Sequence, residues 1–75
     1  MSTEIEIRAE ITGTLWKILV ATNVPQSAGS SLAVIESMKM EIPVEAPAAG
    51  FVAEFFFEEG AAVEEGTVIA RYVAD

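Results

Sequence analysis

Short β-branched apolar runs alternate with clusters of Gly, Pro, Asn and Ser along almost the whole chain. Runs of this length, broken by turn-forming residues, are typical of β-strands. No window keeps an apolar stripe at 3.6-residue spacing over three turns. The pattern therefore predicts an all-β chain, with short paired segments near Gln26 and Val63. The main strands are expected at 5–8, 14–20, 32–37, 41–45, 51–57 and 67–72.

One segment, 58–65, comes nearest to a helical pattern, but Gly60 and Gly66 weaken it because glycine is a poor helix former. Within the strand at 51–57, Phe55 and Phe57 share one face and are expected in the core. Phe56 takes the other face. It is expected to be partly exposed, as is Trp16, which leaves open a docking patch or a dimer contact.

The chain contains an internal repeat with an offset of 37 residues. Two copies of a small β unit can share one core around a pseudo-twofold axis, although neither could bury its apolar face alone. The repeat predicts a flattened β-barrel or sandwich of two small antiparallel sheets. The aligned pairs are Gly13/Gly50, Leu15/Val52, Ile18/Phe55, Val20/Phe57, Asn23/Gly60, Gly29/Gly66 and Leu32/Ile69, with a polarity mismatch at Val34/Arg71.

In this repeat, the segment 37–40 corresponds to Ala74 and the residues that would follow it, where the chain ends. The central hairpin is therefore expected at one end of the barrel, and the two chain termini at the other. A group displayed on that hairpin would lie far from the termini and could enter the cleft of a partner protein.

Length and composition indicate one small domain, residues 1–75, with 52% hydrophobic residues to supply a dense core. Cysteine and histidine are both absent. Disulfides are therefore excluded, which fits a reducing cytoplasm. The common zinc, copper and thiolate sites are also excluded. Nucleophilic triads that need His or Cys are excluded as well.

The formal net charge is −8, which argues against binding to nucleic acid or to anionic membranes. The simplest role for this charge is solubility. No segment resembles a signal peptide, and the apolar runs are much shorter than a membrane span. The expected location is the cytoplasm.

A single lysine, Lys39, stands between Met38 and Met40 near the middle of the chain, and Glu36 and Glu41 flank the group. Strand-like runs lead into and out of it, so the pattern predicts an amine displayed at the tip of a β-hairpin. Strand alternation allows one of the two methionines to pack in the core, but not both. Exposed methionines mark a contact surface, and their flexible side chains suit recognition by several enzymes.

The two glutamates that bracket the hairpin are open to two interpretations. Glu36 and Glu41 could form a cross-strand pair of solubilising charges, which would be mildly unfavourable if they stand opposite each other. They could also contribute to recognition. They are not interpreted as a catalytic carboxylate pair.

The motif and its flanks resemble those of single-domain biotin carboxyl carrier proteins, in the biotinyl/lipoyl-attachment domain family. The family's lysine motif, Glu-Ala/Ser-Met-Lys-Met, is matched by residues 36–40, and Pro43 and Pro47 follow it. Residues 13–18 resemble the family's opening strand, and residues 50–52 and 59–60 resemble markers of its second half. The resemblance extends from about Glu6 to Val73.

This resemblance implies a non-catalytic carrier subunit with biotin covalently attached to Lys39. Met38 and Met40 would be the flanking recognition residues, with Glu36 and Ser37 as weaker parts of the motif. The implied partners are a biotin protein ligase, a biotin carboxylase and a carboxyltransferase. Lys39 would carry carboxybiotin from the carboxylase to the carboxyltransferase.

Two features refine this resemblance. The Glu-Gly-Asp turn of each half is replaced, by Thr-Asn-Val at 22–24 and by Glu-Gly-Ala at 59–61, which puts the stability of both turns in question. No protruding loop fits between Val20 and Leu32, so the chain resembles the thumbless carriers of acyl-CoA carboxylases.

Two alternative functions remain. A lipoyl carrier would use the same fold, although lipoyl hairpins typically read Asp-Lys-Ala where this chain reads Met-Lys-Met at 38–40. An unmodified interaction module would use the hairpin and the aromatic side chains as a protein-binding surface.

Overall fold

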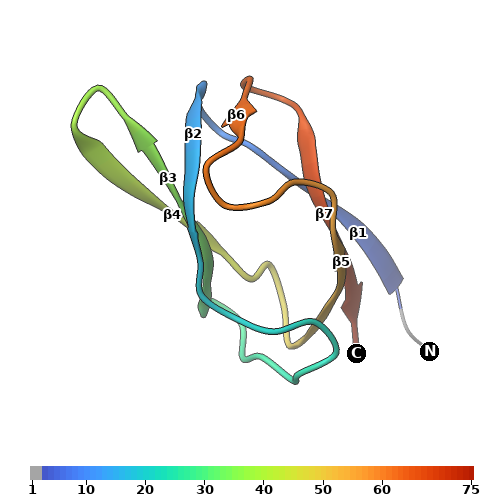
Figure 1. The fold of residues 1–75 in the computed structure, drawn as a ribbon. Helices are drawn as coiled ribbons and strands as arrows, with labels where there is room; N and C mark the ends of the chain where they lie inside the picture. Colours follow the sequence, from blue (N-terminus) through green and yellow to red (C-terminus); the bar gives the residue numbers. More distant parts are fainter. Residues whose placement is uncertain (1–2) are drawn as a thin grey trace.

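The computed structural model describes residues 3–75, which form seven strands in two antiparallel sheets (Figure 1). The four-stranded sheet has the order β4-β3-β2-β6 and the three-stranded sheet the order β1-β7-β5. Residues 3–75 contain no helix, and so none that could cross a membrane. The strands are β1 (Thr3–Arg8), β2 (Gly13–Ile18), β3 (Ser31–Ser37), β4 (Met40–Glu45), β5 (Gly50–Phe55), β6 (Ala62–Val63) and β7 (Val68–Ala74).

This architecture confirms the predicted all-β fold of two small sheets. The segment that came nearest to a helical pattern, 58–65, forms a turn and then β6. The short pairings expected near Gln26 and Val63 are also present. Gln26 makes an isolated bridge to Gly50, and Val63 pairs with Gly13.

The core lies between the two sheets and is built from the alternate, inward-facing positions of their strands. Phe55, the last residue of β5, and Phe57, beyond its end, are partly buried and pack against this core. Tyr72 is the largest fully buried side chain, and its hydroxyl donates a hydrogen bond of 2.6 Å to the Ala48 carbonyl. The other core residues are Ile7, Ala9, Leu15, Leu32, Ala33, Ile35, Ala46, Val52, Val63, Ile69, Ala70 and Ala74.

The backbone repeats itself with the predicted offset of 37 residues. Strands β1, β2 and β7 have their counterparts in β4, β5 and β3. The turn contacts are duplicated too. The Asn23 N–H donates to the Val52 carbonyl over 2.8 Å, and the Gly60 N–H donates to the Leu15 carbonyl over 2.7 Å. Equivalent hydrogen bonds between equivalent residues establish the pseudo-twofold relation between the halves.

Two glycines of the repeat sit where the backbone of another strand passes very close. A β-carbon on Gly13 would overlap the Glu36 carbonyl oxygen, and one on Gly50 would overlap the Val73 carbonyl oxygen. The pair Asn23 and Gly60 has another requirement, since their φ angles are 64° and 93°. Asparagine and glycine tolerate such left-handed backbone best, which explains why they align.

The second of the two turns, at 59–61, is braced by a residue other than aspartate. In the second turn, the Glu59 carboxylate accepts a hydrogen bond of 2.8 Å from the Ile18 N–H, at the end of β2. The Ala61 N–H donates to the Glu58 carbonyl over 3.1 Å. A glutamate side chain and the backbone therefore supply the bracing in this turn.

Candidate functional site

The hairpin between β3 and β4 has a loop of two residues, Met38 and Lys39. The last pair of the ladder is Ser37 and Met40, so the lysine lies at the tip of the hairpin, as predicted. The φ angles of Met38 and Lys39 are 50° and 68°. Positive φ at both central residues is the pattern of a type I′ turn, which matches the right-handed twist of the flanking strands.

Neither residue of this turn is a glycine or an asparagine, the residues that usually occupy left-handed positions. Such backbone costs a residue with a β-carbon about 1–2 kcal/mol. Sequence reasoning did not identify this conformation. The strands predicted at 32–37 and 41–45 leave three residues between them, whereas in the structure Met40 pairs with Ser37 and leaves a link of two. A two-residue link selects a primed turn, so the conformation depended on this last pair of the ladder.

Three consecutive side chains at the tip are exposed. Met38 is 93% exposed and Met40 is 61% exposed, so neither methionine packs into the core. Lys39 is exposed as well, and no residue among 3–75 makes a hydrogen bond or an ion pair with its ammonium group. The tip therefore presents a free primary amine between two flexible apolar side chains.

The strands behind the tip hold the hairpin on the core. Ile35 of β3 is buried and pairs with Ile42 of β4, which is half-buried. Closer to the tip, Glu36 and Glu41 stand directly opposite each other and are both exposed. Ser37, the remaining residue of the predicted motif, is half-buried at the last rung. The hairpin has a fixed base and a solvated end.

The hairpin tip lies at one end of the molecule, and the start of β1 and the end of β7 lie at the other (Figure 1). We call β2, β3 and β4 the lysine half, and their counterparts β5, β7 and β1 the terminal half. At the other end, Thr3 of β1 pairs with Ala74 of β7, in the position that Met40 and Ser37 occupy in the lysine half. The molecule measures 38 Å along its longest axis and 18 Å across. The amine is therefore displayed at the end of an elongated body.

The structure supplies the features that covalent attachment to this amine requires. A modifying enzyme must reach the Lys39 Nζ atom, and nothing in residues 3–75 covers it. Within the same residues, no group of three or more acidic side chains is placed to hold a metal ion. The arrangement suits a displayed acceptor for a group that another enzyme attaches.

The two exposed aromatic side chains belong to different sheets. Trp16, 40% exposed, lies in β2, where the ladder with β3 is shifted by a bulge. The Lys17 ammonium lies 5.6 Å from the centre of the Trp16 ring. Phe56, 47% exposed, follows β5 in the other sheet. The prediction that both are partly exposed is confirmed.

Residues 12–72 match the biotin/lipoyl family model, which is described as biotin-requiring enzyme. A biotin/lipoyl attachment protein of Bacillus subtilis is 40% identical over 63 residues, which cover 84% of this chain and 86% of the relative. A biotinylated protein TB7.3 homolog of Mycobacterium leprae is 37% identical over 65 residues, or 87% of this chain and 92% of the relative.

The fold also matches a domain of a much larger protein. A single-chain, multi-domain long-chain acyl-CoA carboxylase superposes with a TM-score of 0.88 at 26% identity. The match covers 96% of this chain but only 7% of the carboxylase. The similarity therefore concerns one domain of that enzyme.

Proposed function

Because this chain belongs to the biotin/lipoyl attachment domain family, we propose that it is a biotin carrier and that Lys39 is the residue acylated. The observation that carries the proposal is the position of Lys39 at the exposed tip of a two-residue turn, between exposed Met38 and Met40. The same methionines favour biotin over lipoate, because lipoyl hairpins typically present Asp-Lys-Ala. The B. subtilis relative is named for both groups and the M. leprae relative for biotin.

The reaction at Lys39 is an acyl transfer. Its ε-amine, deprotonated by a base of the ligase, attacks the acyl carbon of biotinyl adenylate. The new amide C–N bond replaces the C–O bond to AMP, which leaves with the electron pair. The amide is neutral, so the reaction removes one positive charge from a chain whose net charge is −8.

Biotin, when bound, supplies a ureido nitrogen that accepts a carboxyl group from a biotin carboxylase and delivers it to a carboxyltransferase. The chain itself provides position and reach. Tethering at Lys39 raises the local concentration of the group at both active sites. The two sheets keep the base of the hairpin fixed, and the single exposed turn leaves the attached arm free to move.

The acceptor we propose is an acyl-CoA. The match to one domain of a long-chain acyl-CoA carboxylase supports this class. Residues 3–75 form the carrier domain, and we propose that a biotin carboxylase and a carboxyltransferase act on it as its partners.

The first test is the intact mass of the chain, produced in cells that contain a biotin ligase and excess biotin. We expect an increase equal to one biotinyl group, complete loss of that increase in Lys39→Ala, and full modification of the control Lys17→Ala. Lys39→Ala should leave the free energy of unfolding within about 0.5 kcal/mol, because the side chain is exposed.

Three outcomes would contradict the proposal in different ways. Biotin incorporated into a folded Lys39→Ala chain would move the site to Lys17, the other lysine of the sequence. An increase equal to a lipoyl group would assign the chain to lipoyl carriers. No increase with a folded chain and an active ligase would favour an unmodified interaction module.

A further inference from the structure

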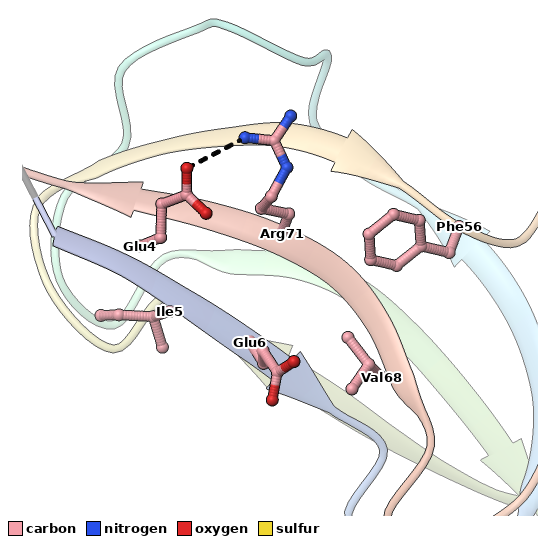
Figure 2. A pocket seen from close by; sticks show the side chains of 6 residues that line it. All are labelled: Glu4, Ile5, Glu6, Phe56, Val68 and Arg71. Atoms are coloured by element: carbon pink, nitrogen blue, oxygen red, sulfur yellow. Dashed lines mark hydrogen bonds and ion pairs between the residues drawn. The ribbon is translucent and has the colours of Figure 1, made fainter.

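The three-stranded sheet, which does not contain Lys39, has a groove of about 230 Å³ on its surface (Figure 2). In Figure 2 the ring of Phe56 points toward the space that Arg71, Val68 and Glu6 surround. The lining residues come from β1, β7 and the segment after β5, and are Glu4, Ile5, Glu6, Phe56, Val68 and Arg71.

One part of the groove is apolar. Phe56 is 47% exposed, while Ile5 and Val68 are half-buried. A half-exposed aromatic ring beside two aliphatic side chains still has apolar surface to bury, worth about 25 cal/mol per Å². The groove is smaller than the ~300–1,000 Å³ of typical small-molecule sites. It fits one large side chain better than a cofactor.

The other part of the groove is acidic. The Arg71 guanidinium is already paired with Glu4 at 3.5 Å and with Glu54 at 3.9 Å; Glu54 does not line the groove but reaches it through this pair. Glu6 pairs with Arg8, at the end of β1. The side chains of these three glutamates remain 58–68% exposed. Each carboxylate can accept several hydrogen bonds, so the groove can bind additional cations.

The pseudo-twofold repeat shows that the fold does not require this chemistry. The positions in the lysine half that correspond to Glu6 and Arg71 are held by Pro43 and Val34. Cross-strand pairing is the same in both cases, since Glu6 pairs with Arg71 and Pro43 pairs with Val34. The same backbone therefore forms with neutral residues at these two positions, and the charges of Glu6 and Arg71 need another explanation. Glu4 differs from them, because its counterpart Glu41 is also a glutamate.

We propose that this groove binds a segment of a partner protein that presents one large apolar side chain flanked by Lys or Arg residues. The apolar side chain packs against Phe56, and the flanking cations pair with Glu4, Glu6 and Glu54. Because the groove and the lysine hairpin belong to different sheets, a partner can hold the domain here while Lys39 stays accessible. This binding does not depend on biotin, so it can be tested independently of the proposed function.

The test uses the ¹⁵N-labelled chain and the peptide acetyl-Arg-Lys-Phe-Arg-Lys-amide, with acetyl-Glu-Glu-Phe-Glu-Glu-amide as the control peptide. We expect the basic peptide to shift the backbone amide signals of Ile5, Phe56, Val68 and Arg71, and the acidic peptide to shift none. Phe56→Ala should weaken binding about tenfold or more, as for a central aromatic anchor. The matched variant Trp16→Ala removes a similarly exposed aromatic from the other sheet and should bind normally.

A second variant, Glu6→Gln, keeps the shape of the groove and removes one charge. It should weaken binding and reduce its salt dependence. The proposal is overturned if millimolar basic peptide moves none of the groove amides, or if Trp16→Ala weakens binding as much as Phe56→Ala. It is also overturned if the chain forms a dimer in solution that Phe56→Ala dissociates, because the occupant would then be a second copy.

Discussion

The lysine half and the terminal half of this domain have the same strand arrangement but differ in their connections and in their exposed side chains. In the lysine half, β3 and β4 are joined by two exposed residues with positive φ. In the terminal half, the equivalent strands β7 and β1 are the two ends of the chain. The two halves therefore differ at this point: β3 and β4 are joined by a two-residue turn that displays Lys39, and β7 and β1 are not joined to each other.

The second difference lies on the outer surface of the sheets. In the terminal half, Arg71 and the surrounding glutamates form an acidic groove beside Phe56. In the lysine half, Val34 and Pro43 occupy the corresponding rung next to Lys17. Buried positions are apolar in both halves, as at Leu32 and Ile69, whereas the exposed positions Pro43 and Glu6 differ in charge. Burial in a shared core constrains both copies alike, and solvent exposure leaves each copy free to acquire its own chemistry.

The largest effect on stability is expected when Gly13 or Gly50 gains a methyl group, because each lies against a carbonyl oxygen of the neighbouring strand. Gly50→Ala and Gly13→Ala should each lower the free energy of unfolding by about 2–3 kcal/mol, because the new β-carbon overlaps a carbonyl oxygen of the neighbouring strand. Urea unfolding measures both. If one substitution were tolerated and the other not, the two halves would not be equivalent at this contact.

A smaller effect, specific to the terminal half, concerns Tyr72, whose counterpart in the lysine half is Ile35. Burial, with a contribution from the charge of Asp75, raises the pKa of the Tyr72 phenol. The unfolded chain ionises near pH 10, before the folded chain does. The protonated Tyr72 phenol therefore makes its full contribution to the free energy of unfolding below about pH 10. That contribution is lost as the pH rises through the pKa of Tyr72 in the folded chain.

Tyr72→Phe tests that expectation. It removes the hydrogen bond to the Ala48 carbonyl and should cost about 1–2 kcal/mol at neutral pH. Above pH 10, the free energy of unfolding should fall less steeply in Tyr72→Phe than in the unchanged chain, because the variant has no phenol at this position to ionise. An unchanged alkaline decline in the Phe variant would show that other groups cause it.

The smallest effect on stability is expected at Gly60, whose counterpart in the repeat is Asn23 and whose φ angle is positive like that of Asn23. Gly60→Asn places at the second turn the residue that Asn23 provides at the first, and no atom lies within 4 Å of the new β-carbon. The change in the free energy of unfolding should stay within about 0.5 kcal/mol. Gly60→Val, in contrast, should cost about 1–2 kcal/mol, because a β-branched residue resists positive φ. Equal costs would mean that the turn does not hold its left-handed backbone.

Most of the fold could be read from the sequence, and the errors in the strand ends follow the repeat. The strands predicted at 14–20 and 51–57 end at Ile18 and Phe55, two residues early in both copies. Strand β7 instead runs beyond its predicted end to Ala74, because it pairs with β1 on one side and β5 on the other. Apolar composition marks where a strand can form, and the available partners decide where it stops.

The sequence alone determined the all-β class, the repeat and the position of Lys39 at a hairpin tip. These depend on local alternation, on turn residues and on spacing along the chain, all of which are present before folding. Only the tertiary structure decided the positive φ angles of Met38 and Lys39, the brace from Glu59 to Ile18, and the acidic groove beside Phe56. The twist of paired strands sets those angles. The brace and the groove join residues that are far apart in sequence, so they exist only once the two sheets have packed around their common core.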